Sequence, residues 1–166
     1  MTLADDLTAV FTDEARRTRN VLEVVPKDRF GWRPHEKSMT LGELAGHLAQ
    51  MPTWVRMYLS DGVDLDKLAE DRDPFVPRTR EALLKTFDES VALFQSTLAT
   101  MDDDFLEATW TMRSGERVLH RAPRHESLRR ILIHHAIHHR GQLTVYLRLL
   151  EVPLPATYGP SADNQV

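Results

Sequence analysis

Hydrophobic residues recur every three or four positions in four stretches of the chain, and this spacing predicts four amphipathic helices. The stretches cover residues 3–25, 40–59, 81–101 and 126–150. Proline follows the first stretch at position 26 and the last at positions 153 and 155, where it stops a helix. The pattern predicts an all-α fold, and four such helices pack most naturally as a four-helix bundle.

The start of the second helix carries its own signal. Thr40 and Glu43 have the spacing of a capping box, in which each side chain satisfies a free backbone N–H of the first turn. Pro52 lies inside the helix and predicts a kink, because proline removes one backbone hydrogen bond. Asp61-Gly62 is expected to end it.

The segments between the helices differ in character. The composition of residues 27–39 predicts an irregular connection. Residues 63–78 are acidic and are expected to form the long connection of the fold. Residues 110–112 and 118–119 can pair as a short hairpin before the last helix. The tail, residues 154–166, is too rich in proline, glycine and polar residues to be helical.

Composition limits the class of protein. With 166 residues, 42% hydrophobic and 28% charged, the chain predicts a single domain over residues 1–166. It contains no cysteine, so thiol chemistry would need an external thiol. No signal peptide or membrane-spanning run is visible, so a cytoplasmic location and no membrane partner are expected.

Charge argues against nucleic acid as a partner. The net charge is −4, although residues 113–130 hold six arginines against two glutamates. We interpret that segment as a solvated arginine-rich surface, with a specific anion site as the alternative.

The histidines supply the candidate chemistry. Four of the eight lie within residues 134–139. At about 100° of rotation per residue, His135 and His139 face the apolar side of the last helix, whereas His134 lies about 120° away and His138 lies at the flank. The apolar side is defined by Leu128, Ile131, Leu132, Leu143, Tyr146, Leu149 and Leu150.

A third histidine belongs to the second helix, where His47 shares an apolar stripe with Met51, Trp54 and Tyr58. A single inward histidine is usually a hydrogen-bonded core residue, but burying three imidazoles without partners carries a desolvation cost at each. One divalent ion shared by the three removes most of that cost. Three nitrogen ligands leave a coordination position open, which is typical of catalytic sites.

Zinc is the default ion for an all-imidazole site, and nickel, iron and other first-row ions also suit imidazole. The zinc-protease pattern HExxH is absent, because position 136 is alanine.

Several neighbours of the histidines have two interpretations. Glu43 either completes the capping box or accepts a hydrogen bond from His47. Trp54 and Tyr58 either fill the core, which we favour, or wall a pocket. His134 and His138 are interpreted as a solvated or interface pair.

Two further residues lie near the last helix or beyond it. We expect Arg140 to pair at a surface or interface rather than to contact substrate. Tyr158, in the tail, is a candidate for covering the site.

Three segments resemble the DinB family, also called DinB/YfiT-like. They are the run from Trp32 through His47 to Ala49, the HxxxHRGQ run from His135 to Gln142 with the residues that follow it, and the closing run from Val152 to Asp163. The resemblance spans nearly the whole chain. It implies an up-down-down-up four-helix bundle, a divalent metal held by His47, His135 and His139, and a homodimer.

The resemblance implies less about the reaction. Some relatives resemble thiol-dependent transferases, in which a metal lowers the pKa of a low-molecular-weight thiol, and others resemble metal-dependent hydrolases. The first hypothesis is therefore an enzyme acting on a small molecule. The alternatives are a non-catalytic metal-binding or stress-response protein and, last, an adaptor that uses the arginine-rich segment.

Overall fold

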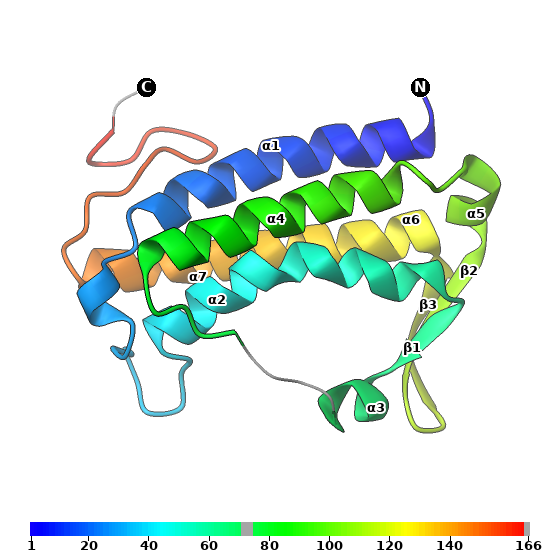
Figure 1. Cartoon of the computed structure of the whole chain (residues 1–166), viewed down its shortest axis with the longest axis horizontal. Coiled ribbons are helices and arrows are strands. Elements are labelled where there is room, and N and C mark those ends of the chain that lie inside the picture. Colours follow the sequence, from blue (N-terminus) through cyan, green and yellow to red (C-terminus); the bar gives the residue numbers. More distant parts are fainter. Residues whose placement is uncertain (71–74, 165–166) are drawn as a thin grey trace.

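Long helices dominate the structure, a computed structural model that describes residues 1–70 and 75–164. The first and third predicted helices are confirmed as α1 (Leu3–Glu23) and α4 (Arg80–Leu98). With α2 (Leu41–Gln50) and α7 (His134–Leu149) they lie side by side (Figure 1). Both α1 and α2 pack against both α4 and α7, so the apolar faces enclose one core.

The second predicted helix changes character where proline enters it. The capping box is confirmed at its start: the Thr40 hydroxyl accepts from the Glu43 backbone N–H, and the Glu43 carboxylate accepts from that of Thr40. Beyond Gln50 the chain continues as a 3-10 helix, Met51–Leu59. Pro52 cannot donate a backbone hydrogen bond, so the α-helical ladder is interrupted there.

The last helix is interrupted by a π-helical segment. It begins as α6 (Arg124–Ser127), passes through the π-helix Leu128–Ile133 and continues as α7. A π-helix has more residues per turn, so counting about 100° per residue across it misplaces later positions. The prediction that Leu149 faces the core is wrong: Leu149 is 57% exposed, whereas Leu147 is fully buried.

A small sheet corrects the all-α prediction. The hairpin is confirmed, with β2 (Thr109–Ser114) antiparallel to β3 (Arg117–Pro123) and Gly115 in the turn with a φ of 56°. A third strand, β1 (Gly62–Asp64), pairs in parallel with β2. Three residues are too few to show a strand period, and so we assigned them to a helix end and a connection.

Other connections contain short helices. Residues 27–39 include a 3-10 turn, Lys27–Arg29, and Asp102 caps the short helix α5 (Asp103–Glu107). Within the predicted long connection, α3 (Leu65–Glu70) follows β1, and residues 71–74 lie outside the described part of the chain. The tail lacks helix as predicted up to residue 164, beyond which the chain is not described.

In the described residues, no helix has both the length and the apolar character needed to cross a membrane.

Candidate metal centre

The structure brings the three predicted histidines together. One ring nitrogen each from His47, His135 and His139 lies within 4.8 Å of the others, and all three residues are half-buried. Ring centroids are 5.8 Å apart for His47 and His135, 4.7 Å for His47 and His139, and 4.5 Å for His135 and His139. No other group of three potential ligands with this proximity occurs in residues 1–70 and 75–164.

Two helices position these side chains. His47 lies on α2, which packs directly against α7. His135 and His139 lie one turn apart at the start of α7, so both rings face α2. His134 and His138 are exposed, as the rotation predicted, although the His138 ring remains 5.0 Å from that of His139.

A hydrogen bond to Gln142 fixes the tautomer of His139 on α7. His139 Nδ1 lies 2.7 Å from the Gln142 side-chain oxygen, so Nδ1 donates and His139 Nε2 carries the lone pair. That Nε2 is 2.8 Å from His135 Nε2. Burial lowers the pKa of His139, and His138 lowers it further, while the bond to Gln142 opposes the shift. Burial thus favours the neutral form of the His139 imidazole.

The donor set fits a divalent ion. Zinc–imidazole bonds are about 2.0–2.1 Å long, so nitrogens on one zinc ion are at most about 4 Å apart. The three nitrogens, already within 4.8 Å, need only small side-chain movements to reach that spacing. Neutral imidazole suits zinc, nickel and other first-row ions. The cluster can therefore bind a metal ion, and the role of each histidine as ligand stays a prediction.

Comparisons with known proteins identify the family of this chain. A model of the DinB family matches residues 1–165. The chain belongs to the DinB family. Its relatives include two Bacillus subtilis proteins named as uncharacterized, YrdA and YjoA, each 25% identical. The alignments cover 91% and 89% of this chain and 85% and 91% of theirs.

Solved DinB-like structures share the fold. A DinB-like protein from Bacillus cereus superposes with a TM-score of 0.73 at 22% identity, covering 93% of this chain and 97% of the other. A DinB-family structure from Exiguobacterium sibiricum gives a TM-score of 0.68 at 23% identity, with 94% and 97% covered. The resemblance seen in the sequence is thus confirmed, and at these identities the structural match concerns the fold alone.

Aromatic residues beside the DinB histidines have separate roles. The Trp54 ring lies 5.3 Å from that of His47 and 5.6 Å from that of His135, so Trp54 forms a wall of the site. Tyr58 is fully buried and donates to the Ser127 carbonyl, and burial raises its pKa well above the usual range. The core interpretation is therefore confirmed for Tyr58. Trp54 is half-buried, packs against the core and also borders the site.

Sequence reasoning missed the partner of His139. We expected a carboxylate, carbonyl or water beside each ligand and named Glu43 for His47, but Glu43 is engaged in the capping box, which also lowers its pKa. In the sequence, Gln142 stands out only as part of the HxxxHRGQ run. The sequence signal for this hydrogen bond is the spacing of three residues between His139 and Gln142, because side chains three apart on a helix are neighbours.

Arg140 corrects another expectation. We predicted a surface or interface role, but the side chain is only 3% exposed and pairs with Glu14 of α1 at 2.6 Å. It lies on the same side of α7 as the buried Leu143 and Leu147. The Tyr158 hydroxyl also lies 2.6 Å from Arg140 and 2.7 Å from Glu14. Tyr158 thus covers this ion pair, and none of its hydrogen bonds in the described residues involves the three histidines.

Arg124 is a second buried arginine. We interpreted residues 113–130 as a solvated surface, yet Arg124 is 2% exposed. Its guanidinium donates to the carbonyls of Tyr58 and Phe105 and pairs with Asp61 at 2.5 Å. Arg124 therefore joins α6 to the end of the 3-10 helix, and the surface interpretation is wrong for this residue.

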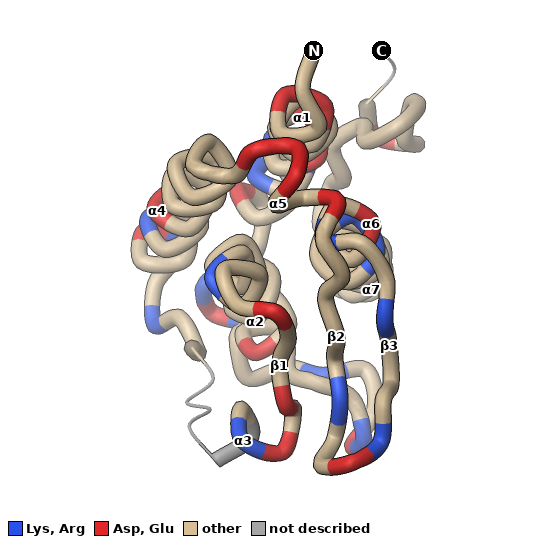
Figure 2. Tube along the Cα trace, turned by 90° about the vertical axis from the view of Figure 1, so that its right-hand side faces the viewer, with Lys and Arg blue, Asp and Glu red and all other residues tan. Residues whose placement is uncertain are grey.

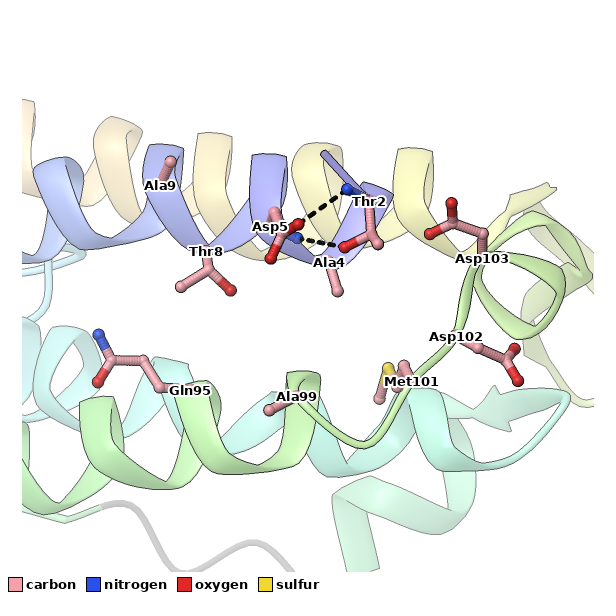
Figure 3. Close-up of a pocket in the computed structure, with 10 residues that line it drawn as sticks. All are labelled: Thr2, Ala4, Asp5, Thr8, Ala9, Gln95, Ala99, Met101, Asp102 and Asp103. Atoms are coloured by element: carbon pink, nitrogen blue, oxygen red, sulfur yellow. Dashed lines mark hydrogen bonds between the residues drawn. The ribbon is translucent and has the colours of Figure 1, made fainter.

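Pocket volume does not mark the histidine site. A surface pocket of about 610 Å³ lies between α1, the end of α4 and the start of α5 (Figure 3). The carboxylates there are already engaged, since Asp5 caps α1, Asp102 caps α5 and Asp103 accepts from the Leu3 backbone. This pocket offers no free catalytic group.

Proposed function

We propose that this DinB-family chain binds one divalent metal ion, zinc or nickel, through His47, His135 and His139. The observation that carries the proposal is the convergence of three imidazole nitrogens within 4.8 Å from two different helices. Gln142 supports it, because a hydrogen bond to His139 Nδ1 leaves Nε2 available as a ligand atom.

We further propose that the ion serves an enzyme acting on a small molecule, of the thiol-dependent transferase or hydrolase type. When bound, such an ion lowers the pKa of a coordinated water or external thiol and so supplies a nucleophile near pH 7. Three protein ligands leave room for that group. The indole of Trp54 shields one side of the histidines from solvent and gives a substrate an apolar surface to rest on.

Metal content tests the ligand set directly. Each histidine is replaced singly by alanine, and bound metal is measured after purification. His47→Ala, His135→Ala and His139→Ala should each lose most of the metal. His134→Ala is the matched control, because His134 is exposed on the same helix and should leave the content unchanged. Full occupancy in all three ligand variants would contradict the proposal.

A second candidate function is non-catalytic metal binding, in which the ion chiefly stabilises the fold. Cobalt-substituted protein separates the two candidates, since its visible spectrum reports a change of ligand. A spectral change on adding a thiol supports the transferase type. No change with any thiol or small electrophile, combined with a large rise in melting temperature on metal binding, favours the structural role.

We also propose that residues 1–166 form one domain, an up-down-down-up four-helix bundle that works as a homodimer in the cytoplasm. The packing of α1 and α2 against both α4 and α7 supports the bundle. Gel filtration with light scattering measures the assembly, and a mass of one chain, 19.1 kDa, would contradict the dimer.

A further inference from the structure

A second hollow lies away from the three histidines. It has a volume of about 380 Å³ and lies where β3 meets α6 and the π-helix Leu128–Ile133. We call it the basic pocket, and its charged and titratable side chains are His120, Arg121, Glu126, Arg129, Arg130 and His134. Figure 2 shows β3 leading to α6, with basic segments along the strand.

The charges in the basic pocket are not balanced. Three arginines line it against one carboxylate, that of Glu126. Arg129 pairs with Asp6 of α1 at 2.6 Å. Arg121 and Arg130 are exposed, and neither makes an ion pair with any other residue that the structure describes. Two guanidinium groups without an ion-pair partner among the described residues create a local positive potential on a chain whose net charge is −4.

We propose that the basic pocket binds the phosphate group of a small molecule through Arg121 and Arg130. Guanidinium groups match phosphate oxygens in charge and in paired hydrogen-bond geometry. The volume of about 380 Å³ is within the range of small-molecule sites, roughly 300–1,000 Å³. A long polyanion is a poorer fit, because the acidic remainder of the chain repels it.

His120 reports the same local potential. Its Nε2 lies 2.9 Å from the Ser127 hydroxyl, which itself donates to the Pro123 carbonyl, so Nε2–H donates to Ser127 and the ring is fixed. Burial lowers the pKa of His120, Arg130 lowers it further, and Glu126 opposes the shift. A phosphate bound beside Arg130 counteracts that arginine, so binding should raise the His120 pKa.

The basic pocket is separate from the proposed metal centre. His134 lines the pocket, whereas its neighbour His135 faces the other way, toward α2. Phosphate binding therefore does not depend on the three-histidine cluster, and the two proposals can fail independently. The variant His47→Ala, which removes a proposed metal ligand, should keep its phosphate affinity.

Phosphate titration followed by NMR tests the proposal in metal-free protein. Inorganic phosphate should shift the resonances of residues in the basic pocket and raise the His120 pKa. Arg121→Gln and Arg130→Gln should each raise the Kd about tenfold, which corresponds to roughly 1.4 kcal/mol. Glu126→Gln should lower the Kd, a gain that partial unfolding does not explain.

Arg117→Gln is the matched control, because Arg117 is an exposed arginine of β3 that does not line the pocket. It should change the Kd less than twofold. An equal loss in Arg117→Gln and Arg121→Gln, or shifts centred on His47, would overturn the proposal. The proposal would also be overturned if an oligonucleotide bound more tightly than phosphate and its binding were weakened equally by Arg117→Gln, Arg121→Gln and Arg130→Gln.

Discussion

Arg140 of α7 and Glu14 of α1 form a buried ion pair one residue away from the proposed ligand His139. Their closest atoms are 2.6 Å apart, and their side chains are 3% and 13% exposed. Arg140 also donates to the Glu14 carbonyl and contacts the Thr18 hydroxyl. This pair joins the helix that carries two of the histidines to the first helix of the chain.

Removing Arg140 should therefore destabilise the protein strongly. Arg140→Ala leaves the Glu14 carboxylate buried without its charged partner, with only the Tyr158 hydroxyl donating to it. The expected loss is about 3–5 kcal/mol in the free energy of unfolding, measured by urea denaturation. Arg16→Ala is the control, since it breaks an exposed pair with Asp13 on α1 and should cost about 0–1 kcal/mol. Similar losses in the two variants would show that the pair contributes little.

Gln142 should control how well His139 binds metal. Gln142→Ala removes the acceptor that fixes the tautomer of His139, and metal affinity should fall about 10–100-fold, as measured with a competing chelator. Gln142→Glu keeps an acceptor at the same place and should restore most of the affinity. If Gln142→Ala binds metal as tightly as the wild type, the hydrogen bond has no role in ligation.

The sequence predicted the helices and the grouping of histidines because both depend on local periodicity. His135 and His139 were separated correctly from His134 and His138, since four residues within six positions leave little room for error in helix rotation. His47 was found by the same argument on an independent helix. The capping box at Thr40 was recognised because its residue types have a specific backbone role.

Features that depend on tertiary contacts were not predictable in this way. The π-helix changes the rotation between Leu132 and Leu143, so the inward side of Arg140 could not be counted from the start of the helix. Arg124 is buried because backbone carbonyls from Tyr58 and Phe105 receive it, and nothing near Arg124 in sequence indicates them. The strand β1 exists only through its pairing with β2.

Acid should destabilise the metal-free protein partly through His120. Because burial and Arg130 lower the pKa of His120 in the folded state below 6.5, the unfolded chain binds more protons as the pH falls through that value. The contribution of His120 to the free energy of unfolding should thus decrease as the pH falls below about 6.5. It stops changing once His120 is also protonated in the folded state.

The difference between wild type and His120→Gln isolates this contribution, because the other titrating groups cancel. Glutamine can still donate to Ser127 but cannot titrate. Urea unfolding between pH 5 and 8, in the presence of a chelator, should show the wild type losing stability relative to the variant as the pH falls. A difference that is constant over this range, or of opposite sign, would refute the assignment.

Gly46, the residue before His47, should tolerate no side chain. A Cβ atom there would lie 2.1 Å from the Phe75 carbonyl oxygen, and that backbone would have to move away from α2. Gly46→Ala should therefore lower the free energy of unfolding by about 1–3 kcal/mol. It should also weaken metal binding through His47.

Gly141 of α7 provides the matched test, because it is helical too and a Cβ there meets nothing within 4 Å. Gly141→Ala should raise the free energy of unfolding by about 0.5–1 kcal/mol, since alanine loses less conformational freedom in a helix. Thermal and urea unfolding of both variants compare the two sites directly. Opposite signs are expected, and a stable Gly46→Ala variant with unchanged metal affinity would show that the 75–77 segment does not constrain α2.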